Sequence, residues 1–455
     1  MPEHVYNLAE YISSSGDGYI KWCKTNKRVS LPSNISKYAR YSSFCHVTVN
    51  QQMVEAFHKS MGLNTLLLFN TRIGEVSCNL FLNLNLVRVL DLCNAGLSDF
   101  PDSICNMTHL RFLDLSKNDI NEIPAKLSML HNLQTLKIDS NERVFQFPAG
   151  MEKLLNLCHL DLESYQPFVN PPGIEQLTNL QTLRTCIVVG YYHDAVWRTG
   201  VLRELVNLQE LRVTFKFGNL IGEEKETNYR DILINMKHLR KLDLFWYPMT
   251  IKHADNLLAS FKPHTNVKHL VLHSCCGINF PAWLGNPSFS NLEIIKVCGC
   301  YSCEFLPSLG KLPLLKYLRV GEMYKLEYID RRFCGHNLSC DKRFPSLKTL
   351  ELVSLSHLER WTGLLDGDMP LLQELNIVGC QMLNSLPTLK FLGSLRKLHF
   401  EYCEKLQAFP DEKPPNKLDS LVILYCPLLL ETCKDEEHKD CAKMLKTTEE
   451  VEPLQ

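Results

Sequence analysis

The apolar residues of this chain recur in short stretches where they alternate with polar ones. Between residues 110 and 118, leucine occupies the first, fourth and sixth positions, and the ninth position is Asn118. Because a single residue separates Leu113 from Leu115, both side chains point to the same side of an extended segment. The stretch therefore predicts a short strand with one buried face.

The same spacing, called the frame below, can be laid along most of the chain. Its first positions are residues 63, 87, 110, 133, 157, 180, 208, 239, 267, 292, 315, 347, 372, 395 and 418. An L-x-x-L-x-L-x-x-N pattern with a period of about 20–29 residues defines the leucine-rich repeat, and most of these spacings fall in that range. One repeat cannot bury its strand alone, so neighbouring repeats must stack. We predict an α/β fold, a curved leucine-rich-repeat solenoid with parallel strands on its concave face.

The extent of the frame divides the chain into three segments. Residues 1–62 precede it and are predicted to form a short, mostly helical entry cap. Residues 63–433 form the solenoid of about 15 repeats, interrupted by inserts at 184–207, 216–238 and 330–343. The charged tail, 434–455, loses the pattern and is predicted to be disordered.

The ninth frame position changes character along the chain. It is asparagine in two early repeats and cysteine in five later ones: Asn118, Asn141, Cys275, Cys300, Cys380, Cys403 and Cys426. A side chain there points inward after the strand and bonds neighbouring backbone groups, a role that the small, weakly donating cysteine can also fill. Five of the 19 cysteines are thus assigned to packing.

One cysteine cluster also has the spacing of a metal site. Cys298, Cys300 and Cys303 lie close together, and His273 or Cys275 could supply the fourth ligand that structural zinc needs. Because Cys300 already occupies the ninth frame position, we favour reduced structural cysteines and predict no metal.

Charge and composition exclude several classes of function. With 49 basic and 50 acidic residues, the net charge of −1 argues against a general nucleic-acid or anionic-membrane binder. The longest apolar runs fall far short of the roughly 18 residues of a membrane span. The N-terminal residues lack the basic and apolar regions of a secretory signal, which favours a cytoplasmic or nuclear location with reduced thiols.

Catalytic and nucleotide-binding motifs are absent from the sequence. There is no Gly-x-Ser-x-Gly or His-Glu-x-x-His, and the one Gly-Lys pair, Gly310-Lys311, is followed by Leu312 and so forms no phosphate-binding loop. We therefore predict that the chain is not an enzyme and holds no cofactor.

The residues between the leucines are the candidate site. The second, third, fifth, seventh and eighth frame positions should face outward from the strands, and exposed Trp, Tyr, Phe and Arg are the types that anchor protein interfaces. A protein ligand is therefore predicted on the concave face, with Trp246→Ala or Arg240→Glu weakening its binding without unfolding. The candidate residues are Arg212, Phe215, Arg240, Lys241, Asp243, Phe245, Trp246, Lys268, His269, His273, Lys316, Tyr317, Arg319, Arg396, Lys397, His399 and Tyr402.

A series of landmarks within residues 237–361 carries a family resemblance. They include Phe280-Pro-Ala-Trp-Leu284, Leu306-Pro-Ser-Leu-Gly310-Lys-Leu-Pro313, Phe344-Pro-Ser-Leu347 and Leu358-Glu-Arg-Trp361. In this order they resemble the repeat domain of plant intracellular immune receptors, the coiled-coil nucleotide-binding leucine-rich-repeat disease-resistance proteins. The N-terminus is similar to the end of that family's regulatory domain, which implies that residues 1–62 include a remnant of this winged-helix segment. However, Pro2 and Glu3 stand where the family has His and Asp, so the nucleotide-facing role of that His does not carry over.

The resemblance implies a function in plant defence. The concave face would recognise a pathogen effector or a guarded host protein, and the first repeats would restrain a nucleotide-binding switch domain or a partner receptor. Three alternatives stay open. They are a substrate adaptor for ubiquitin ligation, although residues 1–62 do not look like an F-box segment; an enzyme inhibitor or generic scaffold; and a truncated, non-functional receptor fragment.

Overall fold

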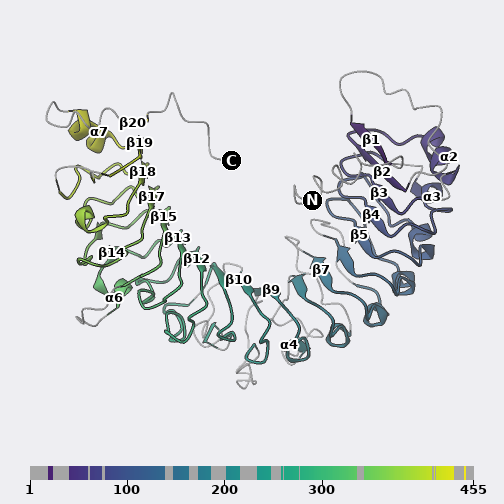
Figure 1. Ribbon diagram of the computed structural model, residues 1–455, viewed down its shortest axis with the longest axis horizontal. Helices are drawn as coiled ribbons and strands as arrows, with labels where there is room; N and C mark the ends of the chain where they lie inside the picture. The colour runs from purple at the N-terminus through teal and green to yellow at the C-terminus, as the bar shows by residue number, and fades with distance from the viewer. Residues whose placement is uncertain are drawn as a thin grey trace, which may run out of the picture. The chain divides into compact units, whose positions relative to one another are not determined.

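The structure, a computed structural model, describes most of the chain. The described residues are 19–23, 40–59, 62–73, 77–138, 147–162, 173–185, 201–215, 233–246, 258–259, 261–275, 277–335, 343–411, 415, 417–434 and 445–446. They belong to two compact units, Met1–Gly218 and Asn219–Gln455, which are called unit 1 and unit 2. In each unit the strands stack on one side, and the loops and short helices lie on the other (Figure 1).

Unit 1 is built on parallel strands stacked in chain order. These are β1 (Tyr19–Cys23), β2 (Tyr41–Cys45), β3 (Thr65–Leu67), β4 (Val89–Asp91), β5 (Phe112–Asp114), β6 (Thr135–Lys137), β7 (His159–Leu162), β8 (Thr182–Thr185) and β9 (Glu210–Phe215). Equivalent frame positions face each other in the register, as in Leu90, Leu113 and Leu136. These leucines are fully buried, so the core of the unit is a continuous row of fourth- and sixth-position side chains.

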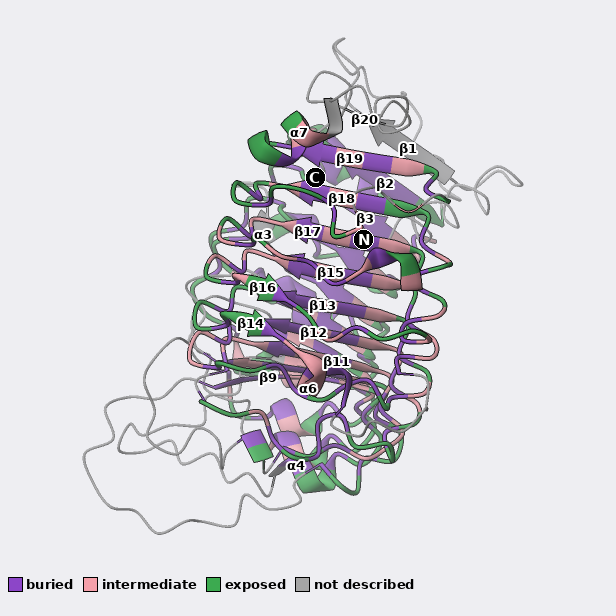
Figure 2. Ribbon diagram, turned by 90° about the vertical axis from the view of Figure 1, so that its left-hand side faces the viewer, coloured by how far each residue is buried: buried purple, intermediate pink, exposed green. Residues whose placement is uncertain are grey.

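Unit 2 repeats the arrangement with strands that are mostly longer than those of unit 1. They are β10 (Lys241–Trp246), β11 (His269–His273), β12 (Ile294–Cys298), β13 (Tyr317–Gly321), β15 (Thr349–Val353), β17 (Glu374–Val378), β18 (Lys397–Glu401), β19 (Ser420–Leu424) and β20 (Leu445–Lys446). A second, small parallel sheet pairs β14 (Tyr328–Ile329) with β16 (Arg360–Trp361). Figure 2 shows buried residues along the main strands and exposed residues at the loop tips.

Short helices occupy the loop side of the repeats. The α-helices are α2 (Gln51–Lys59), α3 (Ser77–Leu80), α4 (Val201–Glu204), α6 (Arg331–Cys334) and α7 (Pro427–Lys434), and the 3-10 helices are η2 (Asp102–Asn106), η3 (Ala125–Met129), η4 (Met151–Lys153), η5 (Ile174–Gln176) and η6 (Leu389–Phe391). Pro101 and Pro124 directly precede η2 and η3 with φ near −70°. Because the proline ring holds φ at this value, these residues start the turn back toward the next strand.

The leucine-rich-repeat solenoid predicted from the sequence is confirmed, but its sheet begins before residue 63. Strands β1 and β2 pair in parallel with each other and with β3, so part of the predicted helical cap is sheet. Residues 1–18 of the predicted helical cap lie outside the described residues. In the tail, β20 pairs with β19, so residues 445–446 are a strand and not disordered.

A residue with a left-handed backbone follows most of the described strands, at the eighth frame position or, for His46, at the equivalent place before the first frame. The residues are His46, Asn70, Asn94, Lys117, Ser274, Gly299, Glu322, Ser354, Gly379, Tyr402 and Tyr425, with φ between 52° and 69°. Apart from Lys117 and Tyr425, their amides continue the ladder to the next repeat, as where the Tyr402 N–H donates to the Leu424 carbonyl at 3.0 Å. This conformation turns the backbone off the sheet, and it leaves the side chains of Tyr402 and Tyr425 44% and 52% exposed.

The ninth position forms the predicted internal ladder. The Asn118 side chain accepts from the N–H groups of Ala95 and Leu97 at 3.0 and 3.1 Å. Its amide nitrogen donates to the carbonyls of Leu92 and Leu115, both at 2.8 Å. One buried side chain thus ties two repeats together through their backbones.

In the later repeats, cysteine takes the same place. The Cys403 thiol lies 3.5 Å from the Ile377 carbonyl of the preceding repeat. Burial raises the pKa of Cys380 to about 12, so its thiol stays protonated and can act as a donor. These cysteines are buried and free, as the packing interpretation predicts.

Candidate binding surface

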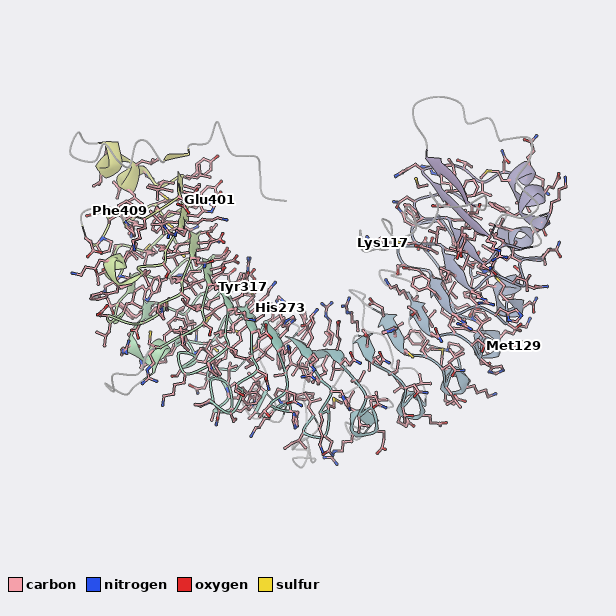
Figure 3. The ribbon with its side chains drawn as sticks, in the orientation of Figure 1. Lys117, Met129, His273, Tyr317, Glu401 and Phe409 are labelled. Carbon is pink, nitrogen blue, oxygen red and sulfur yellow. The ribbon has the colours of Figure 1, made fainter. Side chains whose placement is uncertain are left out.

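The outward side of the strands is called the strand face, made of the second, third, fifth and seventh frame positions. Third- and fifth-position side chains alternate with the buried leucines and therefore point away from the core. In unit 2, His273, Tyr317 and Glu401 project from the strand side, whereas Phe409 lies on the loop side (Figure 3). In unit 1, Lys117 and Met129 lie on opposite sides in the same way.

At β10 and β11 the strand face combines charge with aromatic rings. Lys241 and Asp243 form an ion pair with a nitrogen–oxygen distance of 3.6 Å. Phe245 and His273 are register partners on the two strands, and their ring centroids lie 5.4 Å apart. Arg240 is exposed and donates to the Asn266 carbonyl at 3.4 Å.

A carboxylate between two lysines links β11, β12 and β13. The Glu293 oxygens lie 3.1 Å from the Lys268 ammonium and 2.6 Å from the Lys316 ammonium. The hydrogen bonds from Lys316 and Lys268 lower the pKa of Glu293 to about 2. This carboxylate is therefore ionised throughout the neutral and mildly acidic range, which keeps the three side chains together on the surface.

A second cluster crosses from β12 to β15. Glu351 accepts from the Tyr317 hydroxyl at 2.7 Å and from the Arg319 guanidinium at 2.9 Å. Burial, and then the Glu351 hydrogen bond, raise the pKa of Tyr317 to about 12. The Lys296 ammonium lies 5.6 Å from the centroid of the Tyr317 ring, a cation–π arrangement. These half-buried side chains are held in defined positions before any ligand arrives.

The last repeats of unit 2 carry the other predicted candidates. His399 lies 3.4 Å from Glu401, and burial lowers the pKa of this histidine. The rings of Tyr402 and Tyr425 stack with centroids 4.5 Å apart and an interplanar angle of 5°. The predicted lysine and arginine at the start of β18, Arg396 and Lys397, are both exposed.

The strand face of unit 1 carries a different charge pattern. Asp91 and Asp114 are register partners on β4 and β5, and both are buried. Burial and the neighbouring Asp114 charge raise the pKa of Asp91 to about 6. Further along, Arg184 contacts Glu210 at 2.6 Å, and the predicted Arg212 lies next to Arg184 in the register of β8 and β9.

Two predicted aromatic contacts are wrong, because Phe215 and Trp246 are buried in the core with exposures of 0% and 1%. Strands β9 and β10 extend through the eighth frame position instead of ending before it. The side chain at that position then points to the same side as the buried aliphatic residues two and four positions earlier, which is the inward side. The predicted Trp246→Ala test would therefore disturb the core. Asp243 also differs from the expectation, since only 7% of it is exposed.

Several strand-face residues were missed by the sequence prediction. Glu293, Lys296, Lys348 and Glu351 occupy second and fifth frame positions in the 292 and 347 repeats. The frame places them on the strand face without further information. Two of them, Glu293 and Glu351, are the carboxylates that hold Lys268, Lys316 and Arg319 in place.

The structure offers no metal centre or membrane span within the part of the chain that it describes. None of the described His, Cys, Asp or Glu residues gather in a group of three or more suited to a metal ion. Cys300 and Cys303 are buried and free, and the Cys303 thiol lies 3.2 Å from the Gly277 carbonyl. None of the described helices has the length and apolar character needed to cross a membrane.

The stacked parallel strands, the ninth-position ladder and the 23-residue core period define a leucine-rich-repeat solenoid. The family model "Leucine-rich repeat region" matches residues 64–427, and the chain belongs to this family. A leucine-rich-repeat protein of Leptospira interrogans has the same fold, with a TM-score of 0.54 and 19% identity over 88% of this chain and 92% of its own.

Curated relatives connect this repeat region to plant disease resistance. "Putative disease resistance RPP13-like protein 1" of Arabidopsis thaliana is 30% identical over 409 residues, covering 83% of this chain and 38% of the relative. "Putative disease resistance protein RGA1" of Solanum bulbocastanum is 32% identical over 320 residues, covering 68% and 31%. The chain thus spans about a third of the length of these relatives, and it is similar to the repeat region of plant resistance proteins.

Proposed function

We propose that this chain is the ligand-recognition module of an intracellular plant immune receptor, and that it binds a pathogen effector or a guarded host protein through its strand face. The similarity to plant disease resistance proteins supports the biological setting. A solenoid presents an extended surface for partners instead of an enclosed pocket, which favours a binding role over catalysis. A cytoplasmic location belongs to the same proposal.

The observation that carries the proposal is the chemistry of the strand face over β10–β15. Phe245, His273, Tyr317 and Arg319 are half-buried there, and contacts with their neighbours hold them in place. Tyr and Arg are enriched at the energetic centres of protein interfaces. Side chains that are already ordered lose less conformational entropy on binding, which favours affinity.

A second role follows from the length of the relatives. Because the chain spans about a third of them, a switch domain bound by the first repeats fits the same proposal. Nucleotide binding would then belong to that partner, since the sequence of this chain has no phosphate-binding loop.

The proposal is tested by genetic complementation in the plant that encodes the chain. The gene is disrupted, and resistance to a panel of pathogens is scored after reintroduction of the wild type, Arg240→Glu or Lys325→Glu. Arg240 is exposed on the strand face, whereas Lys325 is exposed outside it and serves as the matched control. We expect disruption to remove resistance to at least one pathogen.

The pattern of rescue separates recognition by the strand face from a purely structural role. The wild type and Lys325→Glu should restore resistance, and Arg240→Glu should not, at equal protein levels. Unchanged resistance after disruption contradicts the defence function. Full rescue by Arg240→Glu, together with full rescue by the doubly changed Phe245→Ala/Tyr317→Ala chain, contradicts recognition by this face.

A further inference from the structure

We infer that the strand face of β10–β15 selects a partner that presents an acidic, extended protein segment. The inference rests on the proposed function, because it names the kind of ligand that the same face would take. It depends on the charge balance, on which cations lack a carboxylate and on the spacing of the strands.

The charge balance of this surface differs from that of the whole chain. The second, third, fifth and seventh positions of the five frames from 239 to 347, called the basic strip, hold seven basic and three acidic residues. The basic residues are Arg240, Lys241, Lys268, Lys296, Lys316, Arg319 and Lys348, and the acidic ones are Asp243, Glu293 and Glu351. Even with Glu322 at the adjacent turn, the balance is positive, whereas the chain as a whole has a net charge of −1.

The three carboxylates of the strip are already engaged. Asp243 pairs with Lys241, Glu293 with two lysines, and Glu351 with Arg319. Among the described residues, Arg240, Lys296 and Lys348 have no carboxylate partner. These three cations therefore keep a positive potential that a ligand's carboxylates can satisfy.

The geometry fits a chain that crosses the strands. Lys296 and Arg319 are register partners on adjacent strands. Parallel strands lie about 4.8 Å apart and an extended peptide rises about 3.3 Å per residue, so about three peptide residues cover two strand intervals. Arg240 directly precedes β10 and Lys348 directly precedes β15. The four strand intervals from β10 to β15 correspond to about six extended peptide residues. Carboxylates at every third position would meet the cations, and apolar residues between them would contact Ile294 and Tyr317.

A nucleic-acid backbone fits this surface less well than an acidic peptide. Phosphates carry continuous negative charge, and they would be repelled by Glu293, Glu351 and the exposed Glu322 within or beside the strip. A peptide can place neutral residues opposite those carboxylates. We therefore assign the strip to a protein segment and leave the oligonucleotide as a competing outcome of the test.

The test measures fluorescence anisotropy with the full chain and a labelled peptide of about twelve residues, long enough to exceed the six-residue crossing. The peptide has glutamate at every third position with tyrosine and leucine between, and a second peptide has glutamine in place of each glutamate. We expect the glutamate peptide to bind about tenfold more tightly at low ionic strength, with the difference shrinking as salt screens the charges.

Two double variants with the same change in net charge locate the site. Lys296→Glu/Lys348→Glu breaks no ion pair to a carboxylate, and it should weaken binding of the glutamate peptide by about tenfold or more. Lys311→Glu/Lys325→Glu reverses two exposed lysines outside the strip and should stay within about twofold of the wild type. If the first variant melts earlier by circular dichroism, Lys296→Gln/Lys348→Gln replaces it.

The remaining binding outcomes overturn the inference, and comparison with the complementation test separates it from the defence function. Equal affinity for the two peptides overturns it, because the carboxylates would then contribute nothing to binding. Equal weakening by both double variants also overturns it, because net charge alone would then explain the loss. Tighter, strip-dependent binding of a single-stranded oligonucleotide of matched charge overturns it in favour of a phosphate ligand. If Arg240→Glu abolishes resistance but the chain does not bind the acidic peptide, the acidic preference is wrong and recognition by the strand face still stands. If the peptide binds as expected but disruption leaves resistance intact, the defence function fails alone.

Discussion

Replacing Asn118 by alanine should destabilise the solenoid far more than any surface change of the same size. The side chain is buried, and its oxygen satisfies the Ala95 and Leu97 amides while its nitrogen reaches the Leu92, Leu115 and Ser116 carbonyls. The Ser116 carbonyl keeps a second donor, the Asn94 amide at 2.8 Å. The Ala95 and Leu97 amides become buried without an acceptor, and the Leu92 and Leu115 carbonyls lose this donor as well. The two amides alone set a lower bound on the loss.

The magnitude follows from those two amides. A buried donor left without a partner costs about 1–3 kcal/mol, so Asn118→Ala should lower the free energy of unfolding by about 2–6 kcal/mol. Repeats contact only their neighbours, so the loss should be concentrated in the 87 and 110 repeats. Thermal melts by circular dichroism report the total effect, and hydrogen exchange with mass spectrometry locates it in peptides that contain Ala95 and Leu97.

Asn121 provides a matched control in the same repeat. It is exposed, and its hydrogen bonds to Ser98 and Asp99 are both 3.3 Å long. Asn121→Ala should therefore change the free energy of unfolding by no more than about 0.5 kcal/mol. Equal melting temperatures for the two variants, with unchanged exchange at Ala95 and Leu97, would refute the role assigned to the ladder.

Two further predictions concern the core and the buried carboxylate of unit 1. Trp246→Ala should lower the free energy of unfolding by about 3–5 kcal/mol because it leaves a cavity in the core. Phe245→Ala on the strand face should lower it clearly less. Equal denaturation midpoints for the two variants would contradict the buried position of Trp246. The pKa of Asp91 is about 6 in the folded chain against an ordinary value of 3.8, so the folded chain binds more protons than the unfolded chain between these two pH values. Its contribution is fully present below pH ~4 and is lost as pH rises through about 6, a change on the order of 3 kcal/mol. Urea unfolding of the wild type and Asp91→Asn should therefore differ by an amount that varies with pH over this window, and a constant difference would rule the explanation out.

The fold was largely predictable because burial in a solenoid is periodic. Leu113 and Leu115 alternate with polar residues, and repetition of that spacing allows no other stable packing than stacked strands. Strand β2 was not recognised from the sequence because it has Ser42 where later repeats have leucine. Its register partner is Leu66, so the backbone ladder continues although the leucine is missing.

The candidate surface was only partly predictable because residue type does not determine where a strand ends. Trp246 and Tyr402 occupy the same frame position in their repeats, and both are large aromatics. In β10 the extended backbone continues and buries Trp246, whereas Tyr402 is left-handed and exposed. The choice depends on the following loop and on the neighbouring repeats, and a single frame contains neither.

The left-handed residue at the end of the strands affects how freely the surface can change. Asn94, Glu322 and Tyr402 differ in size and charge, yet all have φ between 52° and 54° and donate their amide hydrogen to the next repeat. The hydrogen bond uses only the backbone, and a non-glycine side chain there costs about 1–2 kcal/mol of strain, least for asparagine and aspartate. Substitution at this position can thus replace an amide by an acid or a ring without moving the leucine core. Because neighbouring rings can stack, as Tyr402 and Tyr425 do, two such changes in adjacent repeats can create a new contact surface on an unchanged scaffold.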